Sequence, residues 1–167
     1  MKLDIKSFKP SNLSFNKTNI SNGKHVEILY NLSEFKIQLP KCVVLSMTPE
    51  QNKCDLVLSF DIDDNYEHYK FLQIFDYRIM EYLGDETVYK PGHNETTIVE
   101  QGYKKNKIII KLKTTRETKF YDKQKKKMSH YEINVGDYVI PLVITKGIFM
   151  DEKESNQRWT GKQILKL

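Results

Sequence analysis

The sequence contains no alanine, only seven glycines and only two cysteines among its 167 residues. With so few glycines it has none of the glycine-rich loops that cradle phosphates in nucleotide-binding enzymes. Cys42 and Cys54 lack the paired spacing of a zinc site or a disulfide framework, so we predict two reduced packing residues, no metal and no cofactor. No apolar run approaches the roughly 18 residues that span a bilayer. The N-terminus, MKLDIKSFKP, also lacks the apolar core of a signal peptide, so we expect an intracellular protein with no membrane partner.

Catalytic motifs are missing as well. The four histidines are scattered, without the short spacings that place two of them on one metal. The acidic run from Asp61 to Glu67 is the best candidate for a cation site. An EF-hand loop starting at Asp61 would need glycine and a carboxylate where Tyr66 and Leu72 stand, and acidic residues are expected at the start of a helix. We therefore predict no enzymatic activity.

Hydrophobic patterning predicts a mainly β fold. Short segments rich in β-branched and aromatic residues are separated by polar residues, proline or glycine. Between them, residues 66–83 carry apolar side chains at helical spacing, and Gly84 is placed to end that helix. We expect strands within residues 25–32, 35–40, 42–47, 54–62, 107–113, 118–122, 130–135, 137–144 and 158–167.

Strands followed by one helix and then more strands, without βαβ repetition, indicate a small barrel or sandwich. We predict a single OB-like, partly open barrel with one central helix at about residues 66–83; the OB arrangement places that helix between the third and fourth strands. A β-sandwich or jelly roll is the alternative. Residues 1–25, rich in Ser and Asn, are expected to be a loosely ordered N-terminal segment, and residues 26–167 the single nucleic-acid-binding domain.

Positive charge is concentrated in one segment. The chain has 24 lysines and three arginines, and because AT-rich coding supplies lysine everywhere, only the placement of these residues is informative. Residues 104–127, interpreted as one β-hairpin region, hold eleven Lys and Arg against two acids, a net charge of +9. The whole chain is +5, so the remainder carries −4. Such a patch would bind a polyanion with strong salt dependence.

Alternation in KIIIKLK places Lys107, Lys111 and Lys113 on one face of a strand. Aromatic residues interleaved with the basic ones offer rings on which bases can stack, which points to single strands. In the alternative interpretation the lysines are a solvated strand edge and the aromatics, Trp159 included, are core. The predicted nucleic-acid-binding residues are Lys107, Lys111, Lys113, Arg116, Lys119, Phe120, Tyr121, Lys123, Lys125, Lys126, Tyr131, Arg158, Trp159 and Lys162.

The order of segments over residues 26–167 resembles the OB-fold single-stranded DNA-binding proteins of nucleocytoplasmic large DNA viruses. The resemblance rests on the helix FLQIFDYRIMEYL, Tyr89-x-Pro91, the basic strand NKIIIKLK, the strand from Tyr138 to Ile144, and the closing segment from Trp159. It implies a role in viral DNA replication, recombination or repair, in the host cytoplasm, a viral factory or the nucleus. Single-stranded DNA is the expected partner, with RNA and self-association left open. The alternatives are a structural virion protein and an RNA-binding accessory factor.

Overall fold

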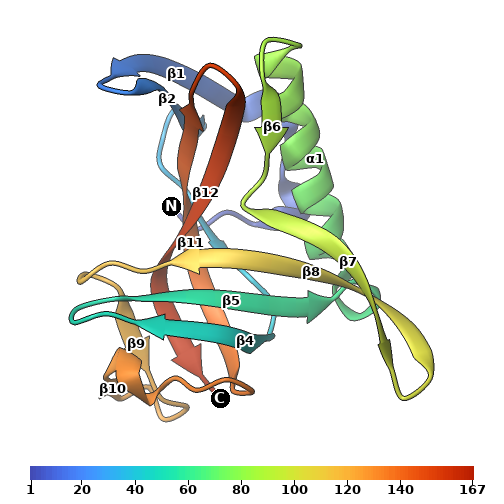
Figure 1. Cartoon of the computed structure of the whole chain (residues 1–167), viewed down its shortest axis with the longest axis vertical. Helices are drawn as coiled ribbons and strands as arrows, with labels where there is room; N and C mark the ends of the chain where they lie inside the picture. The colour runs from blue at the N-terminus through green and yellow to red at the C-terminus, as the bar shows by residue number, and fades with distance from the viewer.

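The computed structural model describes residues 1–167, and strands make up most of it (Figure 1). The one α-helix, α1 (Tyr66–Leu83), lies near the middle of the sequence. The strands are β1 (Leu13–Ile20), β2 (Gly23–Tyr30), β3 (Lys36–Gln38), β4 (Cys42–Pro49), β5 (Cys54–Asp61), β6 (Val88–Lys90), β7 (His93–Glu100), β8 (Tyr103–Lys113), β9 (Lys119–Tyr121), β10 (Lys127–Met128), β11 (Tyr138–Met150) and β12 (Glu154–Lys166). No helix is both long enough and apolar enough to cross a membrane.

Five of these strands form a closed ring in the order β4, β5, β8, β12, β11 and back to β4. All neighbours are antiparallel except β8 and β12, which run parallel and pair Leu112 and Lys113 with Trp159 and Thr160. Two of the five contacts, β8 with β12 and β4 with β11, are only two residue pairs long. A mainly β, OB-like fold with one helix at residues 66–83 is thereby confirmed, and the strands do not form the alternative jelly roll.

The helix comes earlier in the order of the ring strands than predicted. It lies between β5 and β8, the second and third strands of the ring, and not between the third and fourth. The segment between the third and fourth strands, β8 and β11, holds β9, β10 and a 3₁₀ turn, His130–Glu132. Ser129 and Glu132 form a capping box around that turn, so residues 130–135 are not the strand predicted from their composition.

The core fills the ring and the space under the helix. Leu56, Leu58 and Phe60 of β5 are buried, as the alternation in their sequence predicts, and the apolar residues of β8 face them. The inner stripe of α1 includes Phe75, whose ring centroid lies 5.4 Å from that of Trp159 on β12. The helix therefore packs directly on the strand that closes the ring.

The N-terminal segment is ordered, contrary to the prediction for residues 1–25. β1 pairs with β2 along its whole length, and Leu3 and Leu13 belong to the core. The ring of Phe15 stacks on that of Tyr82 of α1, with centroids 4.3 Å apart. Apolar residues are too sparse here to give a periodic signal, and the order comes from tertiary contacts instead.

Residues 104–127 are not one hairpin. β8 pairs with β7 and β5 and, at its last two residues, with β12, whereas β9 pairs with β10 and with a later part of β12. Figure 1 shows the tip of the long β7–β8 hairpin extending beyond the body of the molecule, well apart from β9 and β10, whereas the other end of β8 leads into β9. The +9 segment is therefore distributed over two places in the fold.

Candidate functional site

A groove of about 470 Å³ opens on the outside of the ring, where β6, β8 and β12 meet. We call it the basic groove because four cationic side chains and one carboxylate lie along it. Its lining consists of Lys90, Pro91, Gly92, Lys111, Lys113, Glu154, Asn156, Gln157, Arg158 and Trp159.

Strand alternation places the cations in the basic groove. On β8, Ile110 and Leu112 are buried in the core, so Lys111 and Lys113 point outward. On β12, Trp159 is buried and Arg158 is exposed. Because β8 and β12 run side by side at these residues, the three cations share one face of the ring.

The single carboxylate of the groove has its own partner. Glu154 forms an ion pair with Lys90, and the hydrogen bond between them lowers the pKa of Glu154 and raises that of Lys90. None of the ion pairs in the structure includes Lys111, Lys113 or Arg158. The basic groove thus presents three cations that form no ion pair with the protein.

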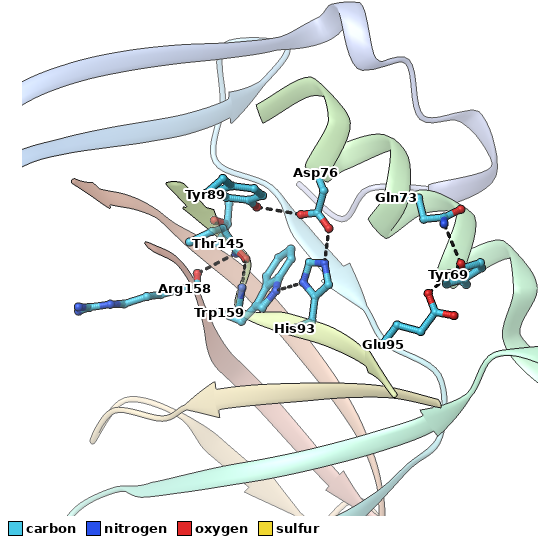
Figure 2. Close-up of polar contacts among 11 residues, drawn as sticks. Tyr69, Gln73, Asp76, Tyr89, His93, Glu95, Thr145, Arg158 and Trp159 are labelled. Carbon is cyan, nitrogen blue, oxygen red and sulfur yellow. Dashed lines mark hydrogen bonds and ion pairs between the residues drawn. The ribbon is translucent and has the colours of Figure 1, made fainter. Parts of the chain in front are cut away.

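A buried hydrogen-bond network fixes the wall of the groove (Figure 2). The indole N–H of Trp159 donates to Nδ1 of His93 at 3.0 Å, and Nε2 of His93 donates to Asp76 of α1 at 2.7 Å. Since Nδ1 accepts a hydrogen bond, the ring proton lies on Nε2. Tyr89 donates its hydroxyl proton to the same carboxylate at 2.8 Å, and burial together with that negative charge raises the pKa of Tyr89. The network ties α1, β6, β7 and β12 together behind the groove.

The turn between β6 and β7 is held against β12 by a second set of contacts. The amide of Gly92 donates to the side-chain oxygen of Gln157 at 2.8 Å. The side-chain nitrogen of Gln157 in turn donates to Thr145 and to the carbonyl of Arg158. A Cβ at residue 92 would lie 2.8 Å from Trp159 Cδ1, so only glycine lets the turn approach the indole this closely.

Two of the predicted stacking residues are part of the core. Trp159 is 2% exposed and Phe120 is 6% exposed, so their rings are covered by protein and cannot stack on a base. Both follow from register: Phe120 pairs with the fully buried Ile164, and Trp159 lies on the inward face of β12. The interpretation of these two residues as a stacking surface is wrong.

A different aromatic group lies on the outer face beside the groove. The guanidinium of Arg158 lies 4.2 Å from the ring centroid of Phe149 on β11. On β2, the strand that pairs with β11 at this point, the ring centroid of His25 lies 4.7 Å from that of Phe149. Figure 2 shows the side chain of Arg158 extending away from the buried network. An arginine plane over an aromatic ring is a surface on which a base can stack. Sequence inspection missed Phe149 and His25 because only strand pairing brings them to Arg158.

Lys107 has a structural role that the sequence did not reveal. Its ammonium lies 2.8 Å from Glu100 and 3.3 Å from Asp61, and its side chain is only 12% exposed. These two carboxylates raise the pKa of Lys107, the hydrogen bond to Glu100 being the largest cause. The lysine is therefore neutralised by the protein and is not free for a phosphate.

The remaining predicted residues lie outside the basic groove. Tyr131 is exposed on the 3₁₀ turn and donates its hydroxyl proton to the carbonyl of Glu50. Tyr121 is half-buried on β9, and Lys162 is half-buried on β12. The others are exposed along β9 and the loops beside it: Arg116, Lys119, Lys123, Lys125 and Lys126.

Comparisons with known proteins give structural neighbours only. No family model matches the sequence, and no curated protein matches it. The fold is similar to that of the single-stranded DNA-binding protein from bacteriophage Enc34, with a TM-score of 0.58 at 14% identity over 92% of this chain and 88% of that one. It is likewise similar to the structure of that protein in complex with ssDNA, with a TM-score of 0.59 at 13% identity over 93% and 94% of the two chains.

These neighbours share the fold of this chain over more than nine-tenths of its length. The class of protein agrees with the resemblance noted in the sequence, although the neighbours come from a bacteriophage and not from a nucleocytoplasmic large DNA virus.

Proposed function

We propose that this protein binds single-stranded DNA without sequence preference, through the basic groove. The observation that carries the proposal is the set of three cations, Lys111, Lys113 and Arg158, that line one open groove and form no ion pair with the protein. The similarity of the whole fold to a phage protein solved with ssDNA supports the same function.

The groove has the two components that single-strand binding needs. Lysines on β8 would neutralise phosphates and release their counterions, which supplies affinity without reading the sequence. Arg158 over Phe149 would offer a planar surface to a base, and stacking of this kind contributes about 1 to 3 kcal/mol per base. Because every base has a flat face, the resulting complex tolerates any sequence.

A protein of this kind would cover single strands as they are exposed during replication, recombination or repair. It would need no cofactor for that task, because binding alone protects the strand.

Fluorescence anisotropy with labelled oligo-dT, oligo-rU and duplex DNA, titrated over a salt series, tests the proposal. We expect the tightest binding to oligo-dT, with affinity falling steeply as salt rises. Lys111→Glu with Lys113→Glu should weaken binding strongly, whereas the same reversal at Lys6 and Lys70, both exposed and outside the groove, should have a small effect. Equal, weak binding of all three nucleic acids near physiological salt would refute the proposal. Preference for oligo-rU would indicate an RNA-binding protein instead.

A further inference from the structure

Two consecutive segments of the chain lie along the same edge of β12. The end of β8 pairs in parallel with Trp159 and Thr160, and β9 pairs in parallel with residues 163–165. The loop between β8 and β9 follows β12 as well, because Thr118 donates its hydroxyl proton to the carbonyl of Gly161 at 2.7 Å.

Both segments turn lysine side chains toward the outer face of the ring. Leu112 and Phe120 are buried, so their neighbours Lys113, Lys119 and Tyr121 lie on the outer face. Arg116, between them in the loop, is exposed. The positive surface of the basic groove therefore continues along β12 toward β9.

A second pocket, of about 480 Å³, lies at the far end of this edge. We call it the Tyr121 pocket. Its apolar lining comes from Ile140 and Leu142 of β11 and Leu165 of β12, beside the Tyr121 ring, and Lys2 and Lys125 line it as well. An apolar wall, one aromatic ring and two cations suit a flat, uncharged ring with a phosphate on each side, which is the chemistry of a nucleotide within a strand.

We propose that a single strand bound in the basic groove continues along β12 and places one of its bases in the Tyr121 pocket, with Lys2 and Lys125 next to the flanking phosphates. This inference rests on the proposed function, since it extends the same bound strand. From Arg158 to Leu165 the strand rises by about 23 Å at 3.3 Å per residue, so only an oligonucleotide longer than the groove itself reaches the pocket.

Oligo-dT length separates the two sites. An oligomer of about four nucleotides, the low end of site sizes for an OB fold, should occupy the basic groove alone, whereas one of about 16 should occupy both sites. Tyr121→Ala should weaken binding of the long oligomer about tenfold and of the short one less than twofold. Lys111→Glu with Lys113→Glu should weaken both. Tyr103→Ala is the matched control, because Tyr103 is 73% exposed on the β7–β8 hairpin and lines neither site.

Tyr121→Trp provides a direct readout that does not depend on the alanine variant folding. Trp159 lines the basic groove and not the Tyr121 pocket, so the wild-type protein titrated in parallel gives the change in Trp159 emission on groove binding. After that change is subtracted, the remaining emission comes from the indole introduced by the substitution and reports on the pocket. Saturation with the long oligomer should quench this remaining emission, and the short oligomer should leave it unchanged. Long-oligomer affinity that is unaffected by Tyr121→Ala, together with unchanged remaining emission from the tryptophan variant, would overturn this inference while groove binding stands. Failure of the wild type to bind either oligomer would overturn the proposed function itself.

Discussion

Neutralising two lysines on β8 gives a quantitative test of the basic groove. Lys111→Gln with Lys113→Gln keeps side chains of similar length and removes two positive charges from the outward face of β8. Each phosphate contact to a single strand changes the slope of log K against log salt by about 0.7. If both lysines contact phosphates, the variant should therefore lose about 1.4 from the magnitude of that slope.

The slope fixes the affinity loss at every salt concentration. A slope difference of about 1.4 corresponds to binding that is about 25-fold weaker at 0.1 M salt and about tenfold weaker at 0.2 M. The plots of log K against log salt for the wild type and the variant should meet near 1 M salt. Anisotropy titrations of labelled oligo-dT at four or more salt concentrations would measure both lines. Lys6→Gln with Lys70→Gln removes the same charge away from the groove and should leave the slope within experimental error of the wild type.

Two results would refute the reasoning. Equal slopes with equal affinities would place the phosphate contacts elsewhere on the protein. Parallel plots of log K against log salt, with the same loss of affinity at all salt concentrations, would indicate a change in groove shape and not a loss of phosphate contacts. A melting curve of the variant distinguishes the second case from partial unfolding.

Three further substitutions test the structure around the groove. Trp159→Phe leaves the buried Nδ1 of His93 without its donor, so it should lower stability by about 1 to 3 kcal/mol in a denaturant titration and change oligo-dT affinity less than twofold. Gly92→Ala forces a methyl group against Trp159 and should cost about 1 to 3 kcal/mol in the same titration; unchanged stability would mean that the turn can move away from β12. Lys107→Gln breaks contacts with two carboxylates and should lower the melting temperature by about 2 to 4 °C. It should not alter the slope of log K against log salt, and a shallower slope would mean that Lys107 contacts a phosphate after all.

The fold could be predicted where the pattern is local. Helical spacing gave the bounds of α1, and alternation around Ile108, Ile110 and Leu112 gave the apolar and basic faces of β8. Lys111 and Lys113 were identified as candidate ligands in the same way and Arg158 from its position beside Trp159, and the structure brings these three together.

What could not be predicted depends on which strands are neighbours. Lys107 has the same alternation as Lys111, yet pairing with β5 places Asp61 beside it. Phe149 carries no signal of its own, and it joins Arg158 only because β11 pairs with β12 in that register. Trp159 sits between two cations in sequence, but a side chain on the inward face of a strand is buried whatever its neighbours are.

The closed ring also determines the order in which the molecule can be assembled. Strands β2, β3 and β4 all take partners on β11, so residues as distant in sequence as Val26 and Ile148 must meet. During synthesis β1 can pair with β2 and β4 with β5, but the edges of β2, β3 and β4 that pair with β11 emerge without their partner, and the ring cannot close until β11 and β12 have left the ribosome. Contacts of such long range make folding slow and leave the nascent chain open to association through those edges. Truncation within β12 should consequently be far more damaging than the loss of a terminal strand in an open sheet.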